Sequence, residues 1–151
     1  MRLYLVQHGE AKSKEEDPDR PLTDRGAVQV REVANRAAAA GMVKVDRIIH
    51  SDKTRARQTA EAWGEALGMG VEEAEGLAPN DDQAIWAGRL GGADVMLVGH
   101  LPHLANLAQT LLGADGAELP VIFRNGELVV LERSASGRWA VVISPPPADY
   151  M

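Results

Sequence analysis

Three short polar segments of the sequence contain side chains that could act on a phosphoryl group. They are His8-Gly9, the segment from Ser51 to Arg57, and His100-Leu101-Pro102. A neutral imidazole is a nucleophile near pH 7 that needs no separate base. A guanidinium such as that of Arg55 can hold two phosphoryl oxygens at once. Because phosphoryl transfer depends mainly on positioning and charge neutralisation, these residue types favour that chemistry.

Each of these segments directly follows a stretch that predicts a β-strand. The three strands are Arg2–Gln7, Asp46–His50 and Asp94–Gly99. The third is the most continuous apolar run, as expected at the centre of a parallel sheet. The carboxyl ends of parallel strands share one edge, where open α/β sheets bind ligands. We therefore expect His8, Arg55 and His100 to converge, with Arg55 in the first turn of a helix that already favours anions.

The remaining patterns predict the elements that hold this edge together. Two long helices are expected, from Thr23 as N-cap to about Ala40 and from Thr54 to Leu67, ended by Gly41 and Gly68. Three shorter elements are expected next: a weak strand at Val71–Ala74, a helix over Gln83–Leu90 capped by Asp81, and a helix after Pro102. Two strands are expected near the C-terminus, at Glu127–Arg133 and Arg138–Ile143, and Pro145–Pro147 should end the structured part. The pattern predicts a three-layer α/β/α fold with a mostly parallel sheet and a C-terminal antiparallel hairpin.

The composition is that of an ordinary globular protein. The chain has 151 residues, of which 45% are hydrophobic and 25% charged, with no cysteine and a net charge of −6. We expect one domain over residues 1–151, and no nucleic-acid partner because the basic residues form no stripe. No apolar run approaches the roughly 20 residues of a membrane helix. A cytoplasmic protein without a metal or cofactor is expected, because the sequence has no apolar leader and no metal-ligand cluster.

Several segments together resemble the histidine phosphatase (phosphoglycerate-mutase-like) superfamily. They are Val6–Ala11, Arg20–Thr23 with Gly26, Ser51 through Ala60, and Gly99–Pro102. The short chain and its Arg-Pro-Leu-Thr segment are similar to the SixA-type phosphohistidine phosphatase branch. The resemblance implies a phosphoglycerate-mutase-like fold and a metal-independent hydrolase that dephosphorylates phosphohistidine on a protein through a covalent phospho-His8 intermediate. Arg55 would then hold the phosphoryl oxygens, and His100 would stabilise the transferring group from the far side, adding charge if it is protonated.

The same resemblance suggests which residues and partners surround the reaction. Gln7, Gly9, Arg20 and Leu101 are expected to bind substrate. The expected partner is a phosphorylated protein such as a histidine-phosphotransfer domain, in a signalling role, and the chain itself is expected to be a monomer or a weak dimer.

Two residues depart from the family pattern. Gln7 stands where the family motif has arginine, so one guanidinium is missing from the expected site. We hypothesise that Arg20, or with less support Lys53, supplies the missing charge. Asp52 stands where many members have proline, and it places a carboxylate near the expected phosphate site.

Two other functions remain open on the sequence. The chain could be a phosphatase or mutase for small phosphate esters that uses Glu75, Asp81 or Asp82 as general acid. It could also be a non-catalytic module that binds phosphate or phosphohistidine, because Gln7 weakens the expected site. The short segment between Gly76 and Gly92 leaves little chain to wall a pocket, which favours an open site and a protein substrate.

Overall fold

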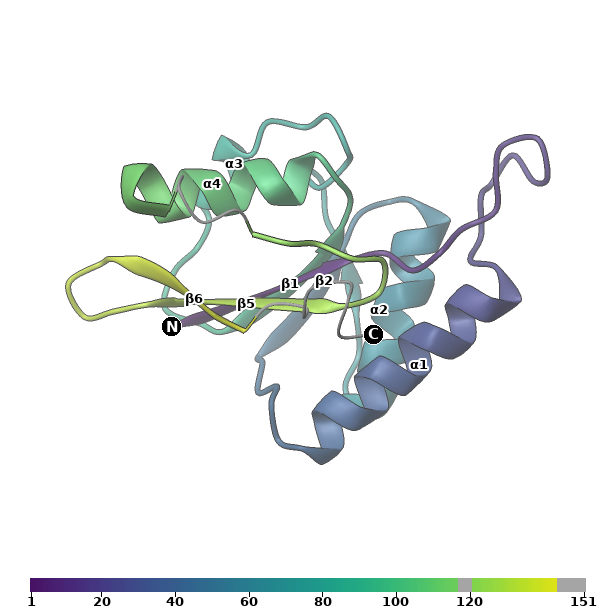
Figure 1. The fold of residues 1–151 in the computed structure, drawn as a ribbon, viewed down its shortest axis with the longest axis horizontal. Coiled ribbons are helices and arrows are strands. Elements are labelled where there is room, and N and C mark those ends of the chain that lie inside the picture. Colours follow the sequence, from purple (N-terminus) through teal and green to yellow (C-terminus); the bar gives the residue numbers. More distant parts are fainter. Residues whose placement is uncertain (117–120, 144–151) are drawn as a thin grey trace.

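The computed structural model describes residues 1–116 and 121–143 (Figure 1). Its elements are β1 (Arg2–Gln7), α1 (Asp24–Ala39), β2 (Arg47–His50), α2 (Thr54–Leu67), β3 (Glu72–Glu73), α3 (Ala84–Ala87), β4 (Val95–Gly99), α4 (His103–Gly116), β5 (Leu128–Arg133) and β6 (Trp139–Ile143). The strand and helix order is the predicted one. The expected end of structure at Pro145–Pro147 lies outside the described residues.

The six strands form one sheet in the order β3-β2-β4-β1-β5-β6. Strands β1, β2, β3 and β4 pair in parallel, whereas β5 and β6 are antiparallel additions at the β1 side. All five residues of β4 are buried, as the continuous apolar run predicted for a strand covered on both faces. The predicted mostly parallel sheet with a C-terminal hairpin is confirmed.

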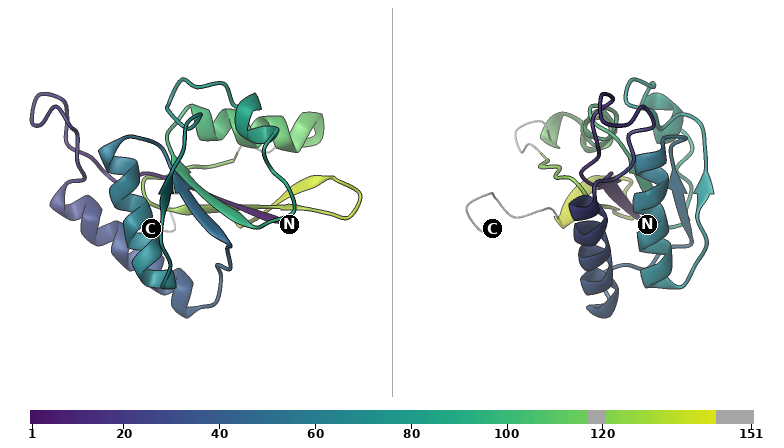
Figure 2. Two further views of the ribbon diagram at one scale, coloured as in Figure 1. Left: turned by 180° about the vertical axis from the view of Figure 1, so that it is seen from behind. Right: turned by 90° about the vertical axis from the view of Figure 1, so that its right-hand side faces the viewer.

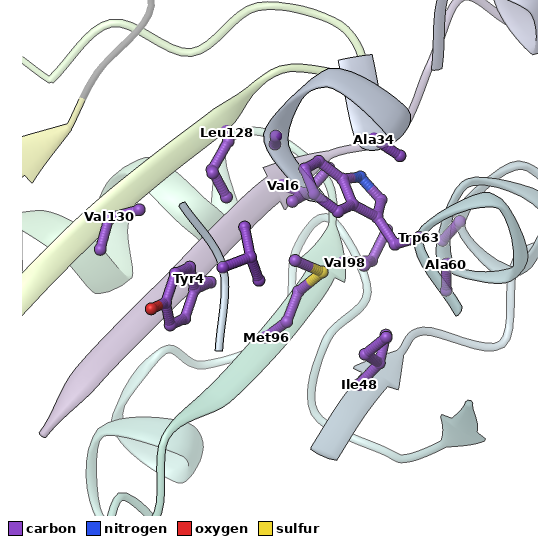
Figure 3. Close-up of a cluster of buried hydrophobic side chains, with 13 residues drawn as sticks. Tyr4, Val6, Ala34, Ile48, Ala60, Trp63, Met96, Val98, Leu128 and Val130 are labelled. Carbon is purple, nitrogen blue, oxygen red and sulfur yellow. The ribbon is translucent and has the colours of Figure 1, made fainter. Parts of the chain in front are cut away.

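Helices cover both faces of the sheet, with α1 and α2 on one side and α3 and α4 on the other (Figures 1 and 2). The alternation of β1 divides its side chains between these layers, because successive side chains point to opposite faces. Tyr4 and Val6 join the cluster under α1 and α2, and Figure 3 shows the indole of Trp63 beside Val6 and Val98. Leu3 and Leu5 pack in the other cluster, under α3 and α4.

Local signals set the ends of the two long helices. The Thr23 hydroxyl accepts a hydrogen bond from the Gly26 N–H at 2.9 Å and caps α1, as predicted. Helix α2 ends at Gly68, whose φ of 68° is in the left-handed region that glycine adopts without steric cost. The Thr23 cap starts α1 beside the segment that follows β1, whereas Gly68 ends α2 at the end away from the predicted site.

The prediction for the segment after β3 was wrong in two respects. Helix α3 covers only Ala84–Ala87, and its N-cap is Gln83 rather than Asp81. The Asp81 carboxylate accepts instead from the Ala78 N–H at 2.9 Å, so it closes the turn before the helix. The predicted weak strand at Val71–Ala74 shortens to the two exposed residues of β3 at the sheet edge. No helix in the described part of the chain is long and apolar enough to cross a membrane.

Candidate active site

The ends of three neighbouring strands bring the predicted residues to one edge of the sheet. The registers pair Gln7 with Gly99 and His50 with Val98, so β1, β4 and β2 end side by side. The His8 N–H donates to the Gly99 carbonyl at 3.0 Å, directly before His100. The rings of His8 and His100 lie with their centroids 5.0 Å apart. The predicted convergence at this edge is therefore present in the fold.

The hydrogen bond of His8 determines which ring nitrogen can react. Its Nδ1 lies 2.7 Å from the Gly9 carbonyl oxygen. A carbonyl only accepts, so Nδ1 carries the proton and Nε2 of the neutral ring carries the free lone pair. Burial lowers the pKa of His8, the bond to Gly9 opposes this, and the charges of Arg55 and Arg20 lower the pKa further. The ring is thus held neutral, in the tautomer that a nucleophile at Nε2 requires.

Arg55 presents an uncompensated positive charge to this edge. It is the second residue of α2, and its side chain is only 9% exposed. Its Nε is buried, and the guanidinium has no hydrogen bond or ion pair with any described residue. Burial and the charge of Arg20 lower the pKa of Arg55, which still remains a cation at neutral pH. A buried cation without a protein partner is an anion-binding group.

Arg20 contributes a second positive charge, from a projecting arm formed by residues 10–23 (Figure 1). The two legs of the arm are joined by a bridge between Ala11 and Leu22. Arg20 has a φ of 47°, which is unusual for a residue with a side chain, and its Nε donates to the Lys12 carbonyl at 3.0 Å. Its charge lowers the pKa of both His8 and Arg55. This proximity supports the prediction that Arg20 replaces the guanidinium missing at Gln7.

Lys53, the other candidate for that charge, is less suited. Its side chain is 43% exposed and lies 3.9 Å from the Asp52 carboxylate. This ion pair with Lys53 also explains why the Asp52 carboxylate is tolerated near the site. The Asp52 side chain is 64% exposed, and its negative charge is paired with the Lys53 ammonium group. The side chain of Gln7 makes no hydrogen bond with the described part of the protein. Gln7 therefore brings no charge to the edge.

His100 is more deeply buried than His8. The residue is 1% exposed, and its Nε2 lies 2.7 Å from the Ser51 hydroxyl oxygen. Burial first, and then the charges of His8, Arg55, Lys53 and His103, lower the pKa of His100 to about 3. His100 is therefore neutral in the free protein, and the charge that a protonated ring would add to the site is absent.

Two of the predicted binding residues have structural surroundings of their own. A Cβ on Gly9 would lie 2.5 Å from Cγ2 of Val30, so helix α1 leaves no room for a side chain there. The Gly9 N–H donates to the Thr59 hydroxyl at 3.0 Å. Leu101 is 39% exposed next to His100. Substrate contacts by Gly9 and Leu101 remain predictions.

Sequence reasoning did not single out Ser51 or Thr59, although both contact predicted site residues. Ser51 directly follows β2, a position that could have marked it. Thr59 lies one helical turn after Arg55, whose carbonyl accepts its hydroxyl at 2.8 Å. His50, interpreted as structural, is 4% exposed and donates from Nδ1 to the Ser51 carbonyl at 2.7 Å.

A cleft of about 590 Å³ opens next to this edge, beside Lys53. Two of the three candidate general acids, Glu75 and Asp81, line the cleft. The Asp82 carboxylate accepts from the Ala84 N–H at 2.9 Å and does not line it. Among the described residues, no three of His, Cys, Asp and Glu are grouped so as to hold a metal ion.

Comparison with known proteins decides the family. The model of the histidine phosphatase superfamily (branch 1) matches residues 3–81. The chain belongs to this superfamily. An uncharacterized protein of Picosynechococcus is 36% identical over 130 residues, covering 79% of this chain and 78% of that protein. The phosphohistidine phosphatase SixA of Escherichia coli K12 is 29% identical over 156 residues, covering 96% and 94%.

The fold of this histidine phosphatase is also that of a solved structure. The protein histidine phosphatase SixA, solved in complex with tungstate, superposes with a TM-score of 0.83 at 26% identity over the full length of both chains. The predicted SixA-type family and phosphoglycerate-mutase-like fold are therefore confirmed. Together these relatives support a phosphatase activity for the chain.

Proposed function

We propose that this chain is a metal-independent phosphohistidine phosphatase that acts on a phosphorylated protein through a covalent phospho-His8 intermediate. The observation that carries the proposal is the hydrogen bond from His8 Nδ1 to the Gly9 carbonyl at 2.7 Å. It leaves the Nε2 lone pair free at an edge where the charges of Arg55 and Arg20 both act on the ring. This arrangement offers a nucleophile and two cations to the same phosphoryl group.

The reaction takes place in two displacements at phosphorus. The His8 Nε2 lone pair attacks a phosphohistidine that carries a proton on its other ring nitrogen. The P–N bond to the substrate breaks with its electron pair going to the leaving nitrogen, so that neutral imidazole leaves. Arg55 and Arg20 neutralise the charge spread over the phosphoryl oxygens. Water then attacks the phosphorus, the P–Nε2 bond breaks, and the proton lost by the water is taken up by the phosphate or by solvent. Inorganic phosphate leaves, and His8 returns to its neutral state.

Three observations support a phosphorylated substrate, and the first of them favours phosphohistidine. The relative of Escherichia coli that matches almost the whole chain is a phosphohistidine phosphatase. The SixA structure that shares the fold holds tungstate, a tetrahedral oxyanion like phosphate. The cleft beside Lys53 has room for more than a phosphoryl group, so it can also accept part of the molecule that carries the phosphate. The proposed partner is a histidine-phosphotransfer domain that carries the phosphohistidine.

The second candidate is a phosphatase for small phosphate esters. It is favoured by the position of Glu75 and Asp81 in the cleft, where either carboxyl group could protonate an alkoxide leaving group. A P–N bond is more labile and needs such an acid less. The third candidate, a binding module without turnover, rests on Gln7 alone, and a pure binder has no use for the neutral Nε2 nucleophile of His8.

The deciding experiment measures phosphate release from a phosphohistidine-carrying phosphotransfer protein. We expect release by wild type, none by His8→Ala, and an acid-labile phosphoenzyme in wild type only. Gln7→Arg should be faster by roughly ten-fold, because a charged donor is added to the site. The matched control is Gln109→Arg, which places the same charge at an exposed position on α4.

Three other outcomes would contradict the proposed function. Turnover by His8→Ala would exclude the covalent mechanism. Inactivity of wild type together with activity of Gln7→Arg would identify the natural chain as a binding module. Faster turnover of small esters than of the phosphoprotein would favour the second candidate.

A further inference from the structure

Helix α2 carries two polar side chains, Gln58 and Thr59, that take no direct part in the proposed reaction. They follow Arg55 by three and four positions along the helix. Residues at this spacing lie on one face of a helix. Gln58 and Thr59 therefore share a face of α2 with the residue whose guanidinium serves the phosphoryl group.

Thr59 is tied both to the segment of the nucleophile and to the backbone of Arg55. It is fully buried. Its hydroxyl donates to the Arg55 carbonyl at 2.8 Å, because a carbonyl can only accept, and its oxygen accepts from the Gly9 N–H at 3.0 Å. The Gly9 carbonyl in turn accepts from Nδ1 of His8. Thr59 thus holds in place the residue that sets the tautomer of His8.

Gln58 makes a similar connection to the arm of residues 10–23 (Figure 1). Its side-chain oxygen accepts from the Leu22 N–H at 2.7 Å, although the two residues are 36 positions apart in the sequence. Leu22 also forms the bridge with Ala11 that closes the arm, and it lies two residues after Arg20. The hydrogen bond therefore attaches the base of the arm to α2, next to the residue that supplies the second cation.

The two connections hold groups whose relative positions matter for the reaction. A misplacement of about 1 Å at a reacting group can lower a rate by about 100-fold. Arg20 donates from Nε to the Lys12 carbonyl of its own arm, so its position relative to His8 depends on how the arm as a whole is anchored. The same reasoning applies to His8, whose ring is oriented by the Gly9 carbonyl.

We propose that Gln58 and Thr59 are positioning residues of the phosphoryl site. Thr59 fixes His8 relative to Arg55. Gln58 fixes the arm, and with it Arg20, relative to the same helix. The inference deepens the proposed function and rests on it. Because each side chain acts through another residue, its removal should disturb the geometry of the site while every reacting group is still present.

The first test removes the anchor of the arm and follows His8 by NMR titration, which needs no turnover. The charge of Arg20 lowers the pKa of His8, so Gln58→Ala should raise this pKa toward its value in Arg20→Gly. It should also lower kcat/KM several-fold. In the Arg20→Gly background, Gln58→Ala should change kcat/KM by less than about two-fold, because changes that act through one interaction are not additive. Gln109→Ala, at an exposed position on α4, is the matched control and should change neither quantity.

The second test removes the hydroxyl of Thr59. Thr59→Val replaces it by a methyl group, whereas Thr59→Ser keeps it. We expect kcat of Thr59→Val to fall by about ten-fold or more with little change in KM, because the cations remain while the nucleophile is misplaced. Ring ¹⁵N shifts should show the His8 proton on Nδ1 in wild type and in Thr59→Ser, with a weaker preference in Thr59→Val.

Thr110→Val is the matched control for Thr59→Val. The Thr110 hydroxyl donates at 2.9 Å to the carbonyl of Asn106, four residues earlier on the same helix, as Thr59 does to Arg55. It lies on an exposed part of α4, so the same substitution there should leave kcat and the His8 tautomer unchanged.

Either of two results would overturn the inference. One is a wild-type pKa of His8 in Gln58→Ala, and this result decides even if Thr59→Val does not fold. The other is a folded Thr59→Val with the kcat and the His8 tautomer of wild type.

The NMR measurements also separate this inference from the proposed function. If Gln58→Ala raises the pKa of His8 but wild type does not hydrolyse phosphohistidine, the proposed function fails and the positioning role stands. If wild type hydrolyses phosphohistidine while the pKa and tautomer of His8 are unchanged in the variants, the proposed function stands and the positioning role is excluded.

Discussion

The imidazole rings of His8 and His100 lie with their centroids 5.0 Å apart and their planes inclined by 53°. The charge of a protonated His8 lowers the pKa of His100, after the larger effect of burial. Burial also lowers the pKa of His8 itself. Both rings are therefore neutral at pH 7 in the free protein. Protonating either ring would lower the stability of the folded state.

Folding stability should consequently fall as the pH is lowered from about 6.5 toward 3. In this range the unfolded chain protonates its histidines at their ordinary pKa, whereas folded His100 stays neutral down to about 3. The unfolded state then binds more protons, so the free energy of unfolding rises with pH across this range. The lowered pKa values of His8 and His103 act in the same direction.

Urea unfolding midpoints at pH 7.5, 6.5, 5.5 and 4.5 would measure this dependence. His100→Gln removes one titrating group, so it should unfold with a shallower dependence on pH than wild type. Equal slopes in the two proteins would show that the pKa of His100 is not lowered by the fold.

Arg20→Gly should reduce kcat/KM by about ten-fold or more while leaving stability within about 1 kcal/mol of wild type. The activity falls because a charged donor to the phosphoryl group is lost. Stability is preserved because glycine adopts the φ of 47° without the cost of roughly 1 kcal/mol that a side chain meets there. A simple folding defect therefore would not account for the loss.

The pH profile of the same variant gives a second readout. The charge of Arg20 lowers the pKa of His8, so its removal should raise that pKa. The acid limb of kcat/KM should then move to higher pH in Arg20→Gly, since the nucleophile must be neutral. Lys53→Ala is the control, and a larger effect from Lys53 than from Arg20 would reverse the assignment of the second cation.

Glu75→Gln and Asp81→Asn should leave phosphohistidine hydrolysis within a few-fold of wild type. The labile P–N bond requires little help from a general acid, although both side chains line the cleft. Asparagine keeps an oxygen to accept from the Ala78 N–H, which Asp81 contacts at 2.9 Å, so the turn should persist. A large loss of activity on an ester with a poor leaving group, such as a sugar phosphate, with little loss on phosphohistidine, would identify an acid used only for esters.

Gly9→Ala should lower the free energy of unfolding by about 1–3 kcal/mol, the range for forcing a methyl group into a packed site. The added Cβ would lie 2.5 Å from Cγ2 of Val30. Gly70→Ala is the matched control because its added Cβ has no neighbour within 4 Å. Val30→Ala in the Gly9→Ala background should recover part of the loss, and strict additivity in this double-mutant cycle would contradict the contact.

The sequence alone determined most of the elements and the edge at which the site forms. Strand β1 and helix α2 have the predicted bounds because alternation, helical propensity and the glycine at position 68 act within a few residues along the chain. The placement of His8 and His100 follows from the same local signals, because each comes directly after a strand and parallel strands end at one edge. The family motifs lie on these elements, so they could also be identified without a structure.

Only the tertiary structure decided the electrostatics and the exact contacts of the site. Burial and through-space charge depend on segments that are distant in sequence, and they make His100 neutral in the free protein. The contact of Ser51 with His100 spans 49 positions, and no local pattern encodes it. The approach of Arg20 to His8 depends on an arm closed by the Ala11–Leu22 bridge and on one unusual φ angle. Local periodicity specifies which elements form, whereas desolvation and charge coupling exist only once those elements have packed.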